Sequence, residues 1–111
     1  MITDFSLQSE IKDNALVIKT TGYINNSGGE QIAEVFNPHF EDNIVKVVLD
    51  LANTNVINSI GISYLIEIIE KLNDKNGKLY FMNLDHSIEK TFTIMGLFQF
   101  AEKISSLDEV K

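Results

Sequence analysis

The sequence predicts a single α/β domain: a mixed sheet of four to five strands, built from βα units, with helices packed mainly on one face. Three observations lead to this class. Residues 44–51 are almost continuously Val, Ile and Leu, which is typical of a strand covered on both faces. Residues 60–73 follow with apolar side chains on one helical stripe. Strand, polar loop and helix then recur over residues 79–95, and repeated βα units favour right-handed crossovers.

Composition fits one compact domain spanning residues 1–111. The 111 residues are 44% hydrophobic, enough to bury a core without covalent staples. The chain has no Cys and only two histidines, far apart in sequence, so we expect no disulfide, no metal and no cofactor. The start is not a secretory signal, and no apolar run approaches the roughly 20 residues of a membrane span. We therefore expect a cytoplasmic protein without a membrane partner.

The charge of the chain argues against nucleic acid as a partner. The formal net charge is −7, and the nine basic residues are all Lys, spread singly along the sequence. There is no basic stripe to neutralise phosphates and no Arg to contact a base edge. The acidity is explained by solubility and suits a basic partner surface.

The first half of the chain predicts a hairpin followed by a helix. Residues 6–11 alternate loosely, Asp13 and Asn14 signal a turn, and residues 15–21 form a β-branched run. Residues 22–29 are the loosest stretch, rich in Gly and Asn. An amphipathic segment of about ten residues follows, and Pro38 is expected to end it as a first helix.

The second half predicts two βα units and a short end. Residues 44–51 form the central strand, parallel to a neighbour, and residues 60–73 form the helix with the clearest stripe. A strand over residues 79–82 leads to Asp85, a good N-cap for a helix that runs to Met95 and stops at Gly96. Residues 100–104 add a short strand, and residues 106–111 a frayed terminal helix.

The most informative segment runs from the central strand into the longest helix. Ser59 lies at the expected start of that helix, where free N–H groups and the positive helix end favour a phosphate. Gly61, which has no Cβ, allows a second backbone to approach closely. The simpler alternative is that Ser59 or Asn58 is an ordinary N-cap, and the pattern alone leaves both readings open.

The same helix predicts a candidate interaction face. With the core stripe centred on residues 62, 66 and 69, Ile60 and Tyr64 point to the opposite side. Their expected neighbours there are Ser63, Glu67 and Lys71. An exposed Tyr and Ile on a polar face suit a partner site, and the alternative is that another helix covers them.

Four motifs, taken together, resemble a known family. VIKTTGYI ends at Ile24, VVLDL at Leu51, VINSIG at Gly61 and IMGLFQF at Phe100. In this order and spacing the chain resembles the STAS domain of bacterial anti-sigma-factor antagonists over about its whole length.

The resemblance implies a phosphorylation switch rather than an enzyme. It places the phosphoacceptor on Ser59. The unphosphorylated protein would bind an anti-sigma factor that is also a serine protein kinase, which releases the sigma factor for transcription. A separate protein phosphatase would reset this partner switch, and the free protein is expected to be a monomer. The partner-binding residues expected on this basis are Asn25, Asn58, Ile60, Gly61, Ser63, Tyr64 and Glu67.

The chain departs from the family pattern at three of these positions. Asn58 and Asn25 stand where the family often has an acid, so negative charge is missing near the expected phosphate. The phosphate dianion is tolerated at least as well, whereas any role of those acids in the kinase reaction is weakened. Ile60 replaces a small polar residue and enlarges the apolar contact beside the acceptor.

Other functions remain as alternatives. Within the same fold, the chain could serve another partner-switching pathway, in stress or motility, or act as a scaffold that is not phosphorylated, and Ser63 or Thr54 could be the acceptor instead. A hydrolase would need His39 or His86 beside Ser59, but the sequence has no triad pattern and no G-x-S-x-G elbow. Nucleotide binding through residues 28–29 lacks the Lys-Ser/Thr end of a P-loop, so these glycines are expected to loosen a loop.

Overall fold

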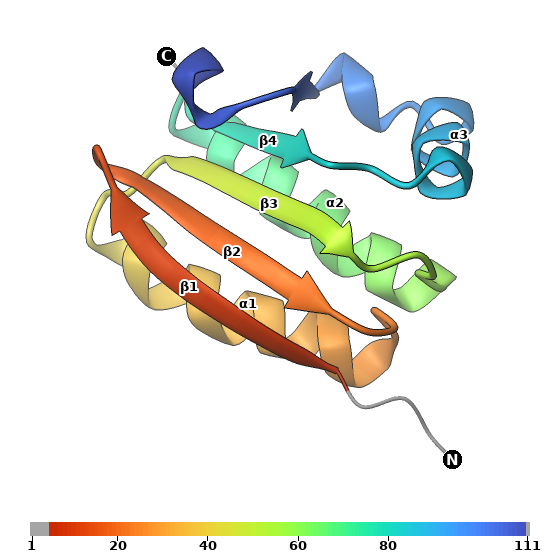
Figure 1. Cartoon of the computed structure of the whole chain (residues 1–111). Coiled ribbons are helices and arrows are strands. Elements are labelled where there is room, and N and C mark those ends of the chain that lie inside the picture. The colour runs from red at the N-terminus through yellow and green to blue at the C-terminus, as the bar shows by residue number, and fades with distance from the viewer. Residues whose placement is uncertain (1–4, 111) are drawn as a thin grey trace.

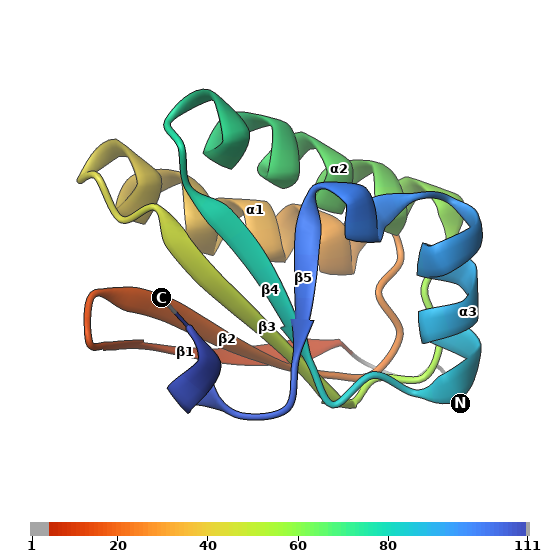
Figure 2. The same ribbon diagram turned by 90° about the horizontal axis from the view of Figure 1, so that it is seen from above.

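A computed structural model describes residues 5–110, which form one five-stranded sheet covered by helices (Figure 1). The strands lie in the order β1-β2-β3-β4-β5; β1 and β2 are antiparallel and the remaining neighbours are parallel. Their bounds are β1 Ser6–Lys12, β2 Ala15–Thr21, β3 Lys46–Asn53, β4 Lys78–Met82 and β5 Ala101–Ile104. Helices α1 (Asn26–Glu41) and α2 (Ser59–Asp74) lie on one face, and α3 (His86–Ile94) lies beyond the carboxyl end of β4 (Figure 2). The predicted fold class is confirmed.

The predicted hairpin forms because its turn suits the twist of the strands. Asp13 and Asn14 have φ values of 51° and 68°, both in the left-handed region. Two successive residues with positive φ are the mark of a type I′ turn, which follows the right-handed twist of an antiparallel pair. Asn and Asp accept this conformation more readily than most residues.

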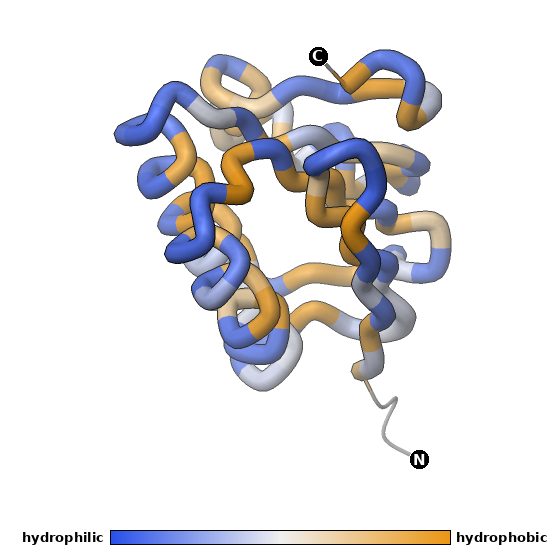
Figure 3. Tube along the Cα trace, turned by 90° about the vertical axis from the view of Figure 1, so that its left-hand side faces the viewer, coloured by the Kyte–Doolittle hydropathy of each residue, from blue (hydrophilic) through white to orange (hydrophobic). Residues whose placement is uncertain are grey.

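The main core lies between the sheet and the helices. Its fully buried residues include Leu16 and Ile18 of β2, Leu49 of β3, Phe36 of α1 and Leu65 of α2. Figure 3 shows hydrophobic residues along the strands and alternating hydrophobic and hydrophilic residues along the helices. A smaller cluster occupies the other face of the sheet, where the chain end covers Val17, Val48 and Tyr80. Strand β3 is thus buried on both faces, as its run of Val and Leu predicts.

Helix α1 is longer than predicted at both ends. The expectation that Gly28 and Gly29 loosen a loop is wrong, because both lie in the first turn of α1, in van der Waals reach of other side chains. The expectation that Pro38 ends the helix is also wrong. Pro38 removes one backbone bond close to the end of the helix, while the rings of Phe36 and Phe40 stack at 5.1 Å on either side of it. Aromatic packing against the core holds the last turn in place.

The end of the chain follows the prediction closely. Asp85 is the N-cap of α3, and Gly96 has a φ of 78° just after its C-cap, as expected of a glycine stop. A short 3₁₀ helix η1 (Leu97–Gln99) leads into β5, and a second, η2 (Leu107–Glu109), follows where a frayed helix was predicted. Lys111, the end of that predicted helix, lies outside the described residues. Among residues 5–110 no helix is both long and apolar enough to cross a membrane.

Candidate functional site: the junction of two helix N-termini

Two loops leave the sheet side by side and lead into α1 and α2. They are neighbours because β2 and β3 are adjacent and parallel, so both strands end at the same edge of the sheet. Ile24 and Ile57 form an isolated parallel bridge between the loops. The backbone of Ile24 donates to Val56 and accepts from Asn58, both at 3.1 Å. These bonds fix the first turns of the two helices next to each other.

Three asparagines, which we call the asparagine junction, cap both helices and link them. The side chain of Asn25 accepts from the Gly28 amide at 3.0 Å, and that of Asn58 accepts from the Gly61 amide at 2.7 Å. Asn58 also donates from its side-chain nitrogen to the Asn26 side-chain oxygen at 3.3 Å. Asn58, one of the two residues considered as an ordinary cap, is therefore the N-cap of α2.

Ser59 is the first helical residue of α2, and its side chain faces solvent. Because Asn58 makes the capping bond, the Ser59 hydroxyl is not used for this purpose, and it has no hydrogen-bond partner among residues 5–110. Within the described residues, the backbone amides of Ser59 and Ile60 also have no hydrogen-bond acceptor. A hydroxyl next to free N–H donors at a helix start can receive a phosphate group without any rearrangement of the cap.

The two helix starts at this junction carry no negative charge of their own, although the chain as a whole is acidic. Neither α1 nor α2 has an acidic residue in its first turn. Each helix start carries the equivalent of about half a positive charge, and here no carboxylate in those turns cancels it. An anion at Ser59 would interact favourably with the start of its own helix and with that of the neighbouring helix.

Gly61 allows the close approach that its sequence position predicts. A Cβ atom on Gly61 would lie 2.5 Å from the Ile24 carbonyl oxygen and 2.9 Å from Cγ2 of Ile24. Real Cβ contacts of this length essentially do not occur, so the loop between β2 and α1 could not lie where it does. Gly61 is thus a structural requirement of the junction.

The predicted interaction face on α2 is only partly exposed. Ile60 is 45% exposed, Ser63 lies at the surface, and the Glu67 side chain is 60% exposed. The expectation that Tyr64 is exposed is wrong: it is half-buried against α1, where a Cβ on Gly29 would lie 2.5 Å from its Cδ2 atom. Each of the two alternatives, an exposed partner site and a face covered by another helix, therefore holds for one residue. Helix α1 partly covers Tyr64 and leaves Ile60 exposed. Ile66, expected in the centre of the core stripe, is only partly buried.

The alternative acceptors differ in accessibility. Thr54 is 2% exposed, and its hydroxyl bonds the Thr20 hydroxyl at 2.6 Å, so an enzyme could not reach it in the folded chain. Ser63 is exposed, but its hydroxyl donates to the Ile60 carbonyl at 2.6 Å. Of the three hydroxyls considered, only that of Ser59 is both exposed and unengaged among residues 5–110.

The histidines do not form a catalytic pair with Ser59. His39 lies in the last turn of α1, where its Nδ1 atom contacts the Val35 carbonyl at 2.8 Å. His86 is the first residue of α3. Among the described residues, no hydrogen bond joins either histidine to Ser59, and no group of three or more His, Cys, Asp or Glu is placed to hold a metal.

Two residues of the site escaped the sequence analysis. Asn26 bridges the two helix starts, and Val56 is 49% exposed on the loop before Ser59. The sequence signal for Asn26 was the expected parallel pairing of two strands, because the loops that follow adjacent parallel strands lie at the same end of the sheet. Applied to the run Asn25-Asn26, that rule would have placed Asn26 close to Asn58.

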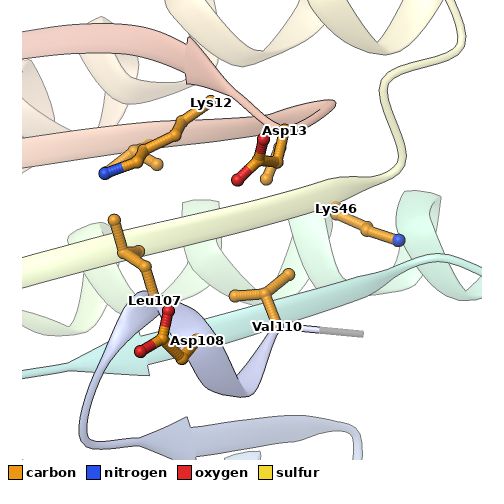
Figure 4. Close-up of a pocket in the computed structure, with 8 residues that line it drawn as sticks. Lys12, Asp13, Lys46, Leu107, Asp108 and Val110 are labelled. Carbon is orange, nitrogen blue, oxygen red and sulfur yellow. The ribbon is translucent and has the colours of Figure 1, made fainter.

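A hollow on the opposite face of the sheet is not part of this site (Figure 4). It has a volume of about 240 Å³ and lies between the hairpin turn and the chain end, at the beginning of β3. Its rim carries Lys12 and Lys46 but also Asp13 and Asp108, so it has no strong preference for either sign of charge.

Comparison with known proteins points to one family. The model of the STAS domain matches residues 6–110. The anti-sigma-B factor antagonist of Staphylococcus aureus is 21% identical over 94 residues, which cover 85% of this chain and 87% of the relative. The crystal structure of a proposed anti-sigma factor antagonist from Thermotoga maritima matches with a TM-score of 0.84 at 14% identity, over 93% of this chain and 89% of the other.

The anti-sigma factor antagonist SpoIIAA of Bacillus is similar in an unphosphorylated and in a phosphorylated structure. The unphosphorylated form matches with a TM-score of 0.75 and the phosphorylated form with 0.74, each at 18% identity. The matches cover 94% and 93% of this chain, and 92% and 95% of the other. The fold of residues 5–110 therefore resembles both forms equally.

Proposed function

This chain belongs to the STAS domain family, and we propose that it is an anti-sigma-factor antagonist controlled by phosphorylation of Ser59. In this proposal the unphosphorylated protein binds a kinase-type anti-sigma factor in the cytoplasm and so frees a sigma factor. The kinase activity of the same partner then phosphorylates Ser59, the complex dissociates, and a phosphatase restores the starting state. The chain itself acts as an interaction module and a substrate of both enzymes, not as a catalyst.

One observation carries the proposal: the Ser59 hydroxyl is exposed and unengaged at the start of α2, in a turn whose cap is made by Asn58. Such a hydroxyl can be modified without loss of the capping bond, so both states keep the fold. The surrounding exposed residues Val56 and Ile60 offer apolar contact area for a partner. The names of the related proteins support the role of an anti-sigma-factor antagonist.

The switch follows from the difference between the free and the bound protein. In the free protein the helix start stabilises the phosphate by about 1 kcal/mol, and water solvates the rest. In a complex that buries this turn, the dianion loses water without a matched cation, which costs several kcal/mol per ion. A net loss of about 4 kcal/mol weakens binding roughly a thousandfold.

The asparagine junction suits a phosphate in an acidic protein. With Asn25 and Asn58 in place of acids, no carboxylate at these two caps repels the modified Ser59. The same absence removes two groups with which a kinase could orient the hydroxyl. We therefore expect the phosphorylated form to be well tolerated and the transfer step to depend mainly on residues of the kinase.

The direct test is phosphorylation by the cognate kinase. The protein is incubated with candidate anti-sigma factors of the same organism and ATP, and the modified residue is identified by mass spectrometry. We expect one phosphate per chain on Ser59, and none after Ser59→Ala. Phosphate on Ser63 or Thr54 would move the switch to another residue, and binding without any phosphate transfer would indicate the scaffold alternative.

A further inference from the structure

A shallow apolar groove runs between the second half of α2 and the segment that follows α3. We call it the α2–η1 groove; its lining includes Ile66, Glu70 and Asn73 of α2 and Met95, Leu97 and Phe100. Figure 2 shows η1 beside α2. The volume is about 250 Å³, slightly below the roughly 300–1,000 Å³ of typical small-molecule pockets. The groove suits one or two side chains of another protein better than a cofactor.

Exposed hydrophobic residues are concentrated on this side of the molecule. Among residues 5–110, six large hydrophobic side chains are exposed. Three lie at or beside the groove: Ile94 is 75% exposed, Met95 48% and Phe100 60%. Two more, Val56 and Ile60, lie beside Ser59, and only Ile11 lies elsewhere. Scattered surface hydrophobics need no explanation, but a cluster of this kind marks an interaction surface.

The groove is continuous with the surface around Ser59 along one helix. Ser59, Ser63 and Ile66 follow one another at spacings of four and three residues on α2, so they lie along one side of the helix. Ile66 is seven residues from Ser59, which corresponds to about 10 Å along the axis. A protein that docks on Ser59 with an interface of ordinary size, about 800 Å² per partner, would reach the groove.

The charge beside the groove selects the kind of occupant. Glu70 is the only ionisable side chain in its lining, and Glu67 and Asp74 lie one turn away on the same face of α2. Among residues 5–110, only Glu67 of these three has an ion pair, with Lys71 at 3.9 Å. A second copy of this chain would bring the same acidic row and a net charge of −7. A segment with basic residues is attracted instead.

We propose that the α2–η1 groove is a second contact point for the anti-sigma factor. It receives an apolar side chain of a partner segment that also carries Lys or Arg opposite Glu67 and Glu70. The identity of the partner rests on the proposed function; the chemistry of the occupant rests on the groove alone. Because the groove does not include Ser59, it contributes to binding whether or not Ser59 can be phosphorylated.

The first test measures affinity for the anti-sigma factor in the Ser59→Ala background, which cannot be phosphorylated at this position. Phe100→Ser removes an exposed ring that lines the groove, and Glu70→Lys reverses the charge. We expect each to weaken binding about tenfold or more, with the Glu70→Lys effect larger at low salt. Ile11→Ser and Glu10→Lys make the same changes on β1, at the far edge of the sheet, and should stay within about twofold.

Thermal unfolding of each variant checks that the fold is intact. Wild-type affinity in folded Phe100→Ser and Glu70→Lys proteins would overturn the groove proposal while leaving the proposed function in place. Conversely, an effect of the Ser59 variants on binding tests the function without reference to the groove.

The second test needs no natural partner. A synthetic amphipathic helix of Leu and Lys is titrated into the ¹⁵N-labelled protein, and a helix of Leu and Glu serves as its control. We expect chemical-shift changes at Ile66, Glu70 and Phe100 with the Leu-Lys helix only, and their loss in Phe100→Ser. Equal changes with both helices, or none at the groove, would refute the charge selection. Dimers in sedimentation experiments that disappear in Phe100→Ser would show a second copy to be the occupant and overturn the proposal.

Discussion

Ser59 is available for modification because the residue before it makes the cap. The hydroxyl of a serine at a helix start commonly accepts a hydrogen bond from a backbone amide of the first turn. Here Asn58 accepts from Gly61 and, through its nitrogen, holds Asn26 of the neighbouring helix. The side chain of Ser59 is left in solvent at a position fixed by two helices. We therefore expect a change of charge at the Ser59 hydroxyl to alter the surface and not the fold.

Substitution of Ser59 tests whether a charge at this side chain prevents binding of the partner. Ser59→Asp places a charge where a partner would bury it, so we expect binding to the anti-sigma factor to fall about a thousandfold. Ser59→Ala should bind as the wild type does and remain bound in the presence of ATP. Isothermal titration calorimetry measures both, with Ser9→Asp, which charges an exposed serine of β1 at the far edge of the sheet, as the control. Unchanged affinity in Ser59→Asp would refute the mechanism.

The sequence located Ser59 but not its surroundings. The position of Ser59 followed from a local pattern, the end of an apolar strand before an amphipathic helix. The contact between Asn26 and Asn58 depends on residues 32 positions apart, and no local pattern describes it. For Tyr64 the helical period gave the correct face, and only the packing of α1 shows that this face is half covered.

At the level of elements, the starts of α1 and α2 pack closely because two glycines at their contact have no side chain. Gly29 lies against the Tyr64 ring, and Gly61 lies against the Ile24 backbone. Helix propensity would favour Ala at both positions by about 1 kcal/mol, so glycine is explained by the close packing. The same packing explains why the prediction for α1 failed at its start: Gly28 and Gly29 are typical loop residues, but here Gly28 lies against Phe5 and Gly29 against Tyr64 of α2.

Gly61→Ala should destabilise the protein, because the new Cβ meets backbone atoms that cannot move aside without shifting the loop. We expect a loss of about 1–3 kcal/mol in the free energy of unfolding by urea, in the range of an overpacked core. A stability equal to or above the wild type would contradict the close approach to Ile24.

Gly29→Ala offers a matched comparison, since its new Cβ meets a side chain. It should be destabilising in the wild type and become neutral or stabilising, by up to about 1 kcal/mol, in a Tyr64→Ala background. A double-mutant cycle by urea unfolding measures this coupling. Additive effects would show that Tyr64 is not the group in contact.

The start of α3 should depend on pH. The Ser87 hydroxyl and amide both donate to the Asp85 carboxylate, at 2.5 and 3.0 Å, and these bonds lower the pKa of Asp85. A carboxyl with a lowered pKa stabilises the fold above its unfolded pKa, about 3.9, and this contribution is lost as the pH falls through the lower folded value. Asp85→Ala should thus be less stable than the wild type at pH 7, and the difference should shrink below about pH 4.

Urea unfolding at pH 7 and pH 3 measures the difference for Asp85→Ala. Asp74→Ala is the control, because Asp74 lies at the end of a helix and has no hydrogen bond from its side chain among residues 5–110. An equally large Asp85→Ala effect at both pH values would exclude the carboxylate as the source.

For the whole molecule, a switch at the end of the sheet should leave the sheet unchanged. The strands contribute residues to both core clusters, and Ser59 contributes to neither. We expect amide chemical-shift changes on phosphorylation to be confined to residues 22–29 and 53–64, with the five strands in their original register. Shifts spread across β4 and β5 would instead indicate a global conformational change.

The fold class followed from the sequence because it depends on patterns of period two and 3.6, which each segment carries by itself. The hairpin, the central strand and α2 needed nothing further. The helix boundaries around Gly29 and Pro38 required knowledge of partners in space, namely Tyr64 for the first and the stacked Phe36 and Phe40 for the second.

The pairing of Asn26 with Asn58 across 32 positions has a consequence for timing in the cell. A ribosome must release both loops, and β2 must pair with β3, before the two helix starts come together. A kinase that recognises the paired helix starts would not act on nascent or misfolded chains, in which Ser59 is accessible but the two helix starts are not joined. Under the proposed function, regulation by phosphorylation would then act only on molecules that have completed this part of the fold.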